Sequence, residues 1–184
     1  MAPPKVIMET DRLRLRTWSH ADADVFDETC NTTKVMRWLG AVQKPRELND
    51  DVQYFIDSYV EDGHTFWVVE RRSDDTFLGF CGFVTVPDED STVEGELEIG
   101  WRIRADMWRK GYAEEAARAS IAWAEVNTGA PRIVSRTAER NQASRALMAK
   151  LGMRHEPSLD CYPEEEDGLL VVYTRQLGCP GRAS

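Results

Sequence analysis

The amino-acid sequence predicts a mixed α/β domain, in which one central sheet is covered by helices on both faces. The first observation is the order of the predicted elements, because helices alternate with strands along the chain. The second is a strand–helix–strand succession across residues 96–138, which predicts a parallel crossover. The third is that the sequence has no internal repeat and no linker that would mark a second domain. We therefore predict a single domain over residues 1–184.

The composition is that of an acidic globular protein of 184 residues with a formal net charge of −9. That charge argues against nonspecific nucleic-acid binding, and it suits a cationic substrate such as an amine, although net charge commonly serves solubility alone. The four cysteines have no CxxC spacing and no histidine partners, so we predict reduced thiols and no metal. The sequence has neither the apolar run of a signal peptide nor a stretch of transmembrane length. We therefore expect a cytoplasmic protein without a membrane or nucleic-acid partner.

The first part of the chain predicts a strand followed by helices. Residues Asp11–Trp18 alternate leucine with arginine, which is the pattern of a half-buried strand. Ser19 is a predicted helix cap, with an acidic residue three positions later. A short helical segment is expected at Thr33–Leu39. The longer run Pro45–Glu61 carries one apolar stripe and stops before Gly63.

A hairpin and three further strands are predicted to complete the sheet. His64–Arg71 and Phe77–Val86 are rich in β-branched and aromatic residues, and a turn sequence separates them. The later strands are expected at Glu94–Arg104, Arg132–Ala138 and Leu169–Gln176.

Two helices are predicted between these later strands. Tyr112–Asn127 has a face of small residues, which lets a helix approach a sheet closely. Asn141–Leu151 has apolar residues on one side and ends at Gly152.

The stretch Glu96–Ala117 joins a strand to a helix through a short basic turn centred on Gly111. The first turn of a helix has unpaired N–H groups and a partial positive charge, so this arrangement predicts a phosphate site. Glu98 lies upstream on the strand, which places a titratable carboxylate on the same segment. The phosphate loop of nucleotide enzymes is disfavoured, because the sequence has no GxxxxGKS or GxxxxGKT run.

Two motifs resemble those of a known family. The turn Arg109–Ala113 (RKGYA) resembles the acyl-CoA pyrophosphate loop of the GNAT superfamily of N-acetyltransferases. Further along, Asn141–Ser144 (NQAS) and Lys150–Met153 (KLGM) resemble the N-x-x-S and K-L-G-F motif of the same superfamily. The lead-in Glu98–Trp101 (EIGW) and Trp108 narrow the resemblance to the RimJ/RimL branch, which includes N-terminal acetyltransferases of ribosomal proteins.

The resemblance covers residues 9–177 and leaves 1–8 and 178–184 as expected flexible ends. It implies the GNAT fold, a central mixed, mostly antiparallel sheet of about six to seven strands with helices on both faces. The sheet of that fold is splayed between its fourth and fifth strands. The resemblance also implies acetyl-CoA (coenzyme A) as the donor and co-substrate, with no metal.

The implied donor site consists of the basic turn, the strand end before it and the start of the next helix. Backbone N–H groups of the turn would bind the CoA diphosphate, and main-chain groups at Arg102 and Ile103 would bind the pantetheine arm. Asn141 would bind the arm from the other side, or act only as the N-cap of its own helix. The turn itself has a second interpretation, a plain helix start with solvated basic residues. The implied donor-binding residues are Arg102, Ile103, Arg104, Arg109, Lys110, Gly111, Tyr112, Ala113, Asn141 and Ser144.

The turn departs from the family pattern at Arg109, where glycine is usual, and proline is common where Ala105 stands. If position 109 needs a left-handed backbone, an arginine there costs about 1–2 kcal/mol. If it does not, the side chain adds a phosphate contact.

Acetyl transfer to an amine needs a base, because only the neutral amine attacks and amines are mostly protonated at neutral pH. Glu98 is the predicted base, with a carboxylate of Glu164–Glu166 as its rival. Strand alternation allows Glu98 to be an outward-facing solvated residue instead. Ser144 is the predicted acid for the departing thiolate, and its alternative is a helix-surface serine. No cysteine has the context of a nucleophile, so direct transfer is expected.

We therefore predict an acetyl-CoA-dependent N-acetyltransferase that moves an acetyl group directly to a primary amine. The leading acceptor is the α-amine of a peptide or protein N-terminus, and a small amine is the next. The alternative is a non-catalytic acyl-CoA-binding or regulatory module of the same fold. The sequence leaves open the acceptor's identity and the choice between a monomer and a homodimer.

Overall fold

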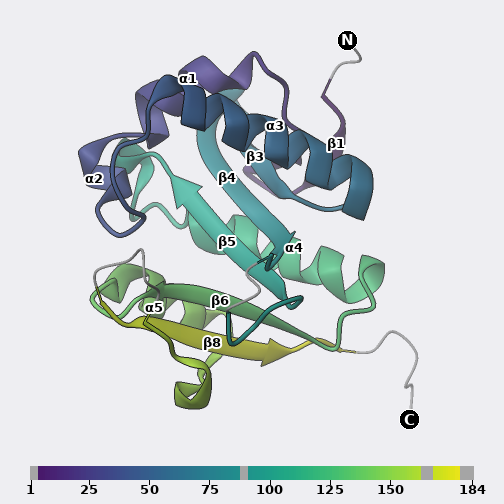
Figure 1. Ribbon diagram of the computed structural model, residues 1–184. Helices are drawn as coiled ribbons and strands as arrows, with labels where there is room; N and C mark the ends of the chain where they lie inside the picture. The colour runs from purple at the N-terminus through teal and green to yellow at the C-terminus, as the bar shows by residue number, and fades with distance from the viewer. Residues whose placement is uncertain (1–3, 88–90, 163–167, 179–184) are drawn as a thin grey trace.

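The computed structural model of the protein describes residues 4–87, 91–162 and 168–178. Within these residues the strands are β1 (Val6–Glu9), β2 (Leu13–Arg16), β3 (Phe66–Arg71), β4 (Thr76–Thr85), β5 (Leu97–Ile103), β6 (Arg132–Ala138), β7 (Arg154–His155) and β8 (Leu170–Gln176). They form one sheet in the order β1-β2-β3-β4-β5-β6-β8-β7 (Figure 1). β5 and β6 are parallel, and the other neighbouring strands are antiparallel.

The sheet has more strands than the sequence predicts. Residues 6–8, which were expected in a flexible end, belong to β1 and pair with β2. A four-residue strand with three consecutive apolar side chains has no alternation by which it could be recognised. β7 contains two residues and is defined by its pairing with β8. The described sheet therefore has eight strands rather than six or seven, while its mixed, mostly antiparallel architecture is as predicted.

The sheet opens between β5 and β6. These are its fifth and sixth strands rather than the predicted fourth and fifth, because β1 adds one strand to the count. These two strands are in register only at Leu97↔Ile133 and Glu98↔Val134. By contrast, β4 and β5 pair continuously from Thr85↔Leu97 to Gly79↔Ile103. Beyond Glu98, β5 and β6 diverge, as Figure 1 shows.

Helices cover both faces of this sheet, as predicted. α1 and α3 lie over the face nearer the viewer in Figure 1, and α4 and α5 lie behind it. The helices are α1 (Asp22–Cys30), α2 (Thr33–Met36), α3 (Pro45–Asp62), α4 (Tyr112–Asn127) and α5 (Gln142–Lys150), with 3-10 turns at Ala105–Met107 and Pro157–Leu159. No helix in the described ranges is both long enough and apolar enough to cross a membrane.

α1 begins later than its predicted cap. The Ser19 carbonyl accepts the Asp22 N–H (3.0 Å), so a turn precedes the helix. The Asp22 carboxylate accepts the Ser19 N–H (2.8 Å) in return. Ser19 and Asp22 therefore close this turn, and the helix starts at Asp22.

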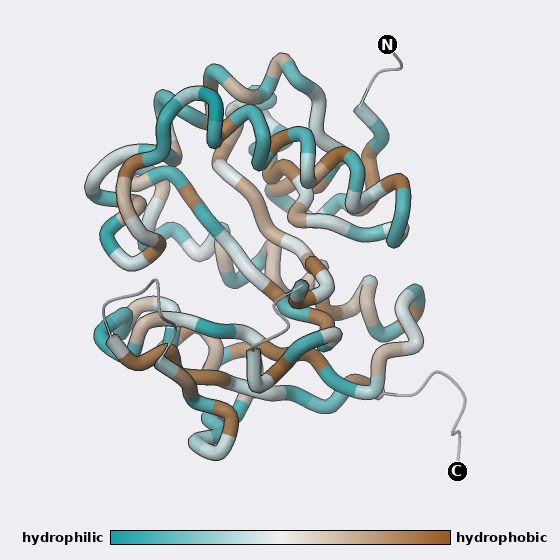
Figure 2. Tube along the Cα trace, viewed as in Figure 1, coloured by the Kyte–Doolittle hydropathy of each residue, from teal (hydrophilic) through white to brown (hydrophobic). Residues whose placement is uncertain are grey.

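Each face of the sheet has its own hydrophobic core. Trp18, Phe26, Phe55 and Phe80 pack under α1 and α3. On the other face, a larger cluster joins the sheet to α4 and α5. Figure 2 shows hydrophobic residues along the central strands and mostly hydrophilic residues on the outer surfaces of α1 and α3.

The small residues of α4 lie against the sheet. Ala116, Ala117 and Ser120 are fully buried, and the Ser120 hydroxyl lies 3.8 Å from the Cys81 sulfur on β4. This close approach confirms the predicted small-residue face. It sets the start of α4 directly beside the end of β5, where the basic turn lies.

Candidate active site

A cleft of about 670 Å³ lies where β5 and β6 diverge. Its walls are α2 and the residues after it, the end of β5, the turn before α4, and α5. The two sequence motifs, which are about thirty residues apart, therefore meet in one cleft. The predicted donor residues that line it are Arg102, Ile103, Arg109, Gly111, Tyr112, Ala113, Asn141 and Ser144.

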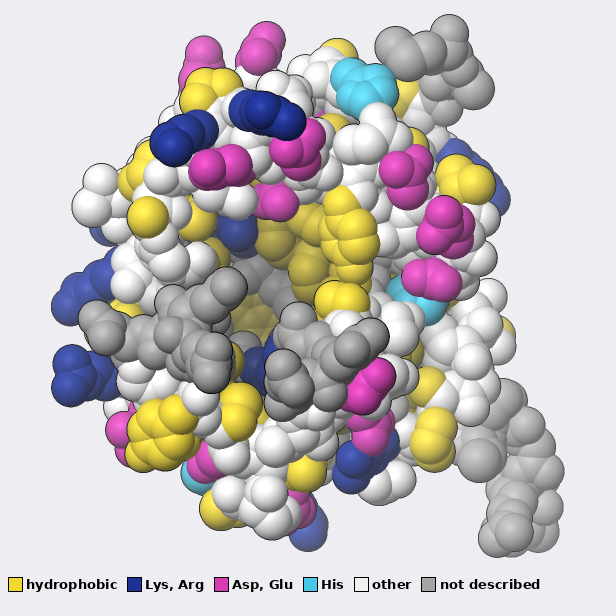
Figure 3. Space-filling model, viewed as in Figure 1, with side chains coloured by type: hydrophobic (Ala, Val, Ile, Leu, Met, Phe, Trp, Pro, Cys, Tyr) yellow, Lys and Arg dark blue, Asp and Glu magenta, His cyan; other side chains and the backbone are white. Residues whose placement is uncertain are grey.

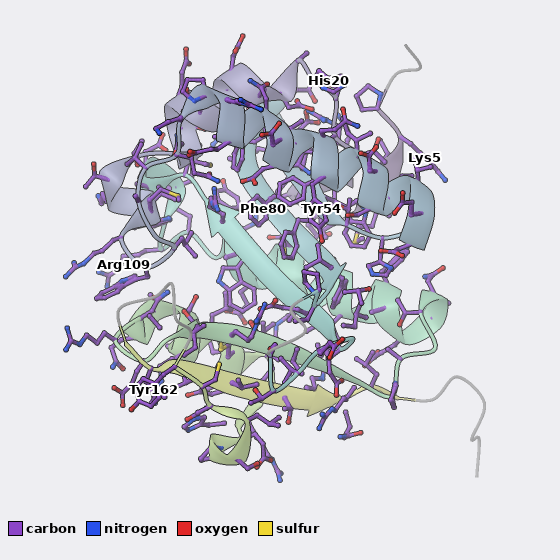
Figure 4. All side chains as sticks on the ribbon, viewed as in Figure 1. Lys5, His20, Tyr54, Phe80, Arg109 and Tyr162 are labelled. Atoms are coloured by element: carbon purple, nitrogen blue, oxygen red, sulfur yellow. The ribbon has the colours of Figure 1, made fainter. Side chains whose placement is uncertain are left out.

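The turn before α4 has a left-handed backbone at two positions. Gly111 has a φ of 81° and is the N-cap of the helix, and Arg109 has a φ of 62°. The Glu115 N–H makes the first helical hydrogen bond, to the Gly111 carbonyl (3.0 Å). The N–H groups of Tyr112 and Ala113 precede that bond, so they are oriented for an anion in the cleft. Figure 4 shows Arg109 at the side of the molecule between α2 and α5.

We expect Arg109→Gly to stabilise the fold by about 1 kcal/mol relative to Arg109→Ala, because alanine keeps the left-handed strain and glycine removes it. Urea denaturation of the two variants measures this difference. Both variants lose the same charge, so the affinity for CoA should weaken equally in both. Equal stability of the two would show that position 109 is not strained.

An N-terminal arginine holds this turn in place. The Arg12 guanidinium donates to the Lys110 carbonyl (3.0 Å) and lies 4.7 Å from the centre of the Tyr112 ring. Its Nε and main-chain N–H donate to the Glu115 carboxylate (2.6 and 3.0 Å). Burial acts to raise the pKa of Glu115, but hydrogen bonds from Thr10 and Arg12 lower it on balance, so the carboxylate stays ionised. The sequence does not reveal that Arg12 supports the turn, because its position in an alternating leucine–arginine run indicates only a strand.

The open edge of β5 presents different main-chain groups from those predicted. Arg104 N–H donates to the Leu78 carbonyl and Val86 N–H to the Glu96 carbonyl, so the even-numbered residues of β5 are bonded to β4. The main-chain groups of Trp101 and Ile103 therefore face β6 and the cleft. The prediction is wrong for the main chain of Arg102, which faces β4, although the residue borders the cleft.

α5 brings two predicted residues to the opposite wall. The Asn141 side chain accepts the Ser144 N–H (3.3 Å) and donates to the Thr137 hydroxyl (2.9 Å), which confirms its role as N-cap. The Ser144 hydroxyl has no hydrogen-bond partner in the described part of the chain, and Ser144 lines the cleft. It is therefore available to a ligand.

Glu98 bridges the divergence of the two strands. Its carboxylate accepts the main-chain N–H of Arg136 (3.2 Å) and pairs with the guanidinium of that residue (2.9 Å). Because the strands separate here, the carboxylate takes the place of a main-chain acceptor on β5. Glu98 is thus largely buried and paired, which excludes the outward-facing solvated interpretation. The rival base, Glu164–Glu166, lies outside the described residues.

Two predicted donor residues are not on the cleft wall. The Arg104 guanidinium pairs with Asp106 (2.7 Å), which lowers the pKa of that carboxyl, and donates to the Phe77 carbonyl (3.3 Å). Lys110 extends toward the Met107 sulfur (3.5 Å). The cleft wall instead includes Trp108, whose role the sequence did not reveal. The Trp108 indole donates a hydrogen bond to the Ile103 carbonyl (2.6 Å). The sequence pattern that could have indicated this role is a tryptophan directly before the basic turn.

Among the described residues, no group of three or more histidine, cysteine, aspartate or glutamate side chains is arranged to hold a metal ion. The cleft is instead basic and aromatic. Lys34 lies over the Trp108 ring, 5.4 Å from its centre, at the α2 side of the cleft. Such a surface suits a ligand that has phosphates and a flat ring.

Comparison with known proteins agrees with this geometry. The model of the acetyltransferase (GNAT) domain matches residues 12–154. The chain is 28% identical over 176 residues to the N-acetyltransferase YoaA of Bacillus subtilis (strain 168), covering 95% of this chain and 91% of YoaA. It is 30% identical over 156 residues to the N-acetyltransferase YjdG of the same organism, covering 80% of this chain and 89% of YjdG.

A solved structure has the same fold at lower identity. The structure of RimL, a ribosomal L7/L12 α-N-protein acetyltransferase in complex with coenzyme A, superposes with a TM-score of 0.76. It is 15% identical and covers 94% of this chain and 98% of that one. The chain belongs to the GNAT acetyltransferase family, and its reaction is acyl transfer from acetyl-CoA.

Proposed function

We propose that the protein transfers an acetyl group from acetyl-CoA directly to a primary amine, and that the acceptor is the α-amine of a protein N-terminus. A small primary amine is the second candidate. One observation carries the proposal: the left-handed basic turn, the open edge of β5 and the free Ser144 hydroxyl line the same cleft. The RimL neighbour supports an N-terminal acceptor and the RimJ/RimL branch.

The cleft walls have separate roles in this proposal. The turn at Arg109–Ala113 and the start of α4 bind the diphosphate. The main-chain groups of Trp101 and the N–H of Ile103 bind the pantetheine arm as an added strand would, since the Ile103 carbonyl already accepts the Trp108 indole. Ser144 donates a proton to the departing thiolate and regains one from solvent, while Glu98 takes the proton of the amine through a water molecule and releases it to solvent.

The two buried thiols, Cys30 and Cys81, are not suited to a covalent intermediate. Burial raises the pKa of Cys30 to about 11 and that of Cys81 to about 12, so both are protonated at neutral pH. The thiolate is the nucleophilic form of cysteine. Direct transfer in a ternary complex is therefore the proposed route.

The acidic surface of α3 suits an amine. α3 contains six acidic residues and one arginine. Figure 3 shows acidic side chains along the upper rim of a hollow at the centre of the view. A negative rim raises the local concentration of a cationic amine.

Release of free thiol from acetyl-CoA, measured with a panel of amines and N-terminal peptides, tests the proposed function. We expect release that depends on the acceptor and yields an N-acetylated product by mass spectrometry. Tight CoA binding without acceptor-dependent thiol release would favour the non-catalytic acyl-CoA-binding module.

Ser144→Ala should lower kcat about ten-fold and leave the Kd of CoA nearly unchanged, since a thiolate makes a modest demand on a general acid. Steady-state kinetics and calorimetry measure the two quantities. Ser158→Ala, which removes an exposed hydroxyl bonded only to Glu156, is the control. An effect confined to the Kd would limit Ser144 to positioning the donor.

A further inference from the structure

A hollow lies on the face of the sheet that α1 and α3 cover. Figure 3 shows its hydrophobic floor, with basic side chains at two of its edges. The strand register places Glu98, Gly100 and Arg102 on this face of β5, with Phe80 beside Arg102 on β4. Figure 4 shows Phe80 and Tyr54 in the space between α3 and β5. The proposed donor occupies the cleft at the side, so this hollow is the approach for the acceptor.

Arg102 is the charged group at one end of this face. Its guanidinium lies over the neighbouring rings of Phe26 and Phe80, 5.2 Å from the centre of each. Its one hydrogen bond among the described residues is long, 3.5 Å to the Gln43 side-chain oxygen, and its buried Nε has no partner among them. Burial lowers the pKa of Arg102, because this environment disfavours the charged form.

An amide separates Arg102 from the nearest carboxylate. The Gln43 side chain donates to Asp51 (2.8 Å) while its oxygen faces Arg102. The main chain of Gln43 is fixed in turn by the buried Asn31, which donates to its carbonyl and accepts its N–H (2.8 Å each). Asp51 therefore attracts the guanidinium only from a distance. No carboxylate of the described residues pairs directly with Arg102.

Other arginines of similar burial in this chain do have direct partners. Arg16 contacts both Asp22 and Glu70 at 2.7 Å. Arg136 contacts Glu98 at 2.9 Å. A buried charge without a partner is unfavourable for folding, and such groups gather at functional sites. Among these buried arginines, Arg102 is the one whose charge lacks a carboxylate partner and so destabilises the fold. A negatively charged ligand that pairs with it would offset this loss of stability.

We propose that Arg102 binds a carboxylate of the acceptor, so that the substrate is a primary amine that also bears a carboxylate. This inference rests on the proposed N-acetyl transfer. The planar fork of a guanidinium matches one carboxylate, and a single cation balances one negative charge rather than the two of a phosphate. Glu98, four residues earlier on the same face and about 13 Å along the strand, is placed to receive the amine. The rings of Phe80 and Phe66, which are stacked 5.0 Å apart, offer an apolar surface between the two charged ends.

Matched acceptor pairs test this inference kinetically. One pair is triglycine and triglycinamide, which extend about 3.3–3.6 Å per residue and so separate the amine from the carboxylate; the other is seryl-aspartic acid amide and seryl-asparagine amide. Each pair differs in one carboxylate. We expect the wild type to prefer the anionic member of one pair, and Arg102→Met to reduce that ratio of kcat/KM by at least about ten-fold. The pair that responds shows whether the carboxylate is the C-terminus of a short peptide or a peptide side chain. Arg72→Met, which changes an exposed arginine bonded to the Thr10 carbonyl, is the control.

A binding measurement makes the test independent of turnover. In the presence of CoA, N-acetyl-triglycine or the N-acetylated aspartyl dipeptide should raise the Tm of the wild type more than its amide counterpart does. In Arg102→Met this difference should vanish, while the Tm of the unliganded variant should rise, because an unpaired buried charge has been removed.

The outcomes separate the two proposals. A wild type that acetylates both members of each pair equally, or a preference that survives in Arg102→Met, overturns the carboxylate site and leaves acetyl transfer standing. No transfer to any amine overturns the proposed function. In that case a carboxylate-selective Tm shift that is lost in Arg102→Met still sustains the site, and equal or absent shifts reject it.

Discussion

Replacing Glu98 with glutamine should lower kcat about 100-fold and leave the Kd of CoA nearly unchanged. Glutamine keeps an oxygen that can accept the Arg136 N–H, so the junction between β5 and β6 can persist. It cannot take a proton from the amine, so the remaining rate should follow the fraction of the acceptor amine that is already neutral. Steady-state kinetics from pH 5 to 9, chosen to span the ordinary titration range of an α-amine, measures both effects.

Glu96→Gln is the matched control for this change. Glu96 pairs with Arg132 across the same two strands, two residues before Glu98, and does not line the donor cleft. Its replacement should affect stability alone. If Glu98→Gln leaves kcat unaltered, Glu98 only joins the strands, and the base is another group.

Gly79→Ala should prevent stable folding, with a loss of more than about 4 kcal/mol. Gly79 has a φ of 134°, and a Cβ there would lie 1.9 Å from the Arg102 carbonyl oxygen, an impossible contact with rigid main chain. β4 and β5 would have to separate at the end of the donor cleft. Urea denaturation and the yield of folded protein report the loss.

Gly95→Ala separates the steric effect from the backbone effect. Gly95 also has a positive φ, 73°, but a Cβ there meets no atom within 4 Å. Its replacement should cost about 1 kcal/mol, the ordinary penalty for a left-handed alanine. If the two variants lose equal stability, the close approach of Arg102 to Gly79 is not what limits folding.

Local sequence patterns predict the part of the fold that lies between the two motifs. α4 and β6 have the predicted bounds, Tyr112–Asn127 and Arg132–Ala138. A glycine N-cap, a small-residue face and a β-branched run are signals that a few neighbouring residues carry. The turn, Asn141 and Ser144 were found for the same reason. They lie in short continuous segments that the crossover brings to one cleft.

The remaining features depend on partners far apart in the chain. Whether Arg102 faces the donor or the acceptor depends on its register with Phe80, and a register cannot be deduced from one strand. The pairing of Glu98 with Arg136 depends on where two strands separate. The isolation of Arg102 depends on Gln43, in a connection between helices that has no motif. In each case the deciding contact is tertiary, so no local pattern could contain it.

The contact between Arg12 and the donor turn has a consequence for synthesis. Arg12, which lies between β1 and β2, is separated from Glu115 by 103 positions, so this contact must wait until more than half of the chain has been synthesised. At about 5–20 residues per second, that interval is about 5–20 s on the ribosome. Contacts of such long range also slow folding, since the chain must close a large loop before they form. The turn that receives the donor is therefore completed late. The nascent chain can bind CoA fully only after the segment around Arg12 has packed against the start of α4.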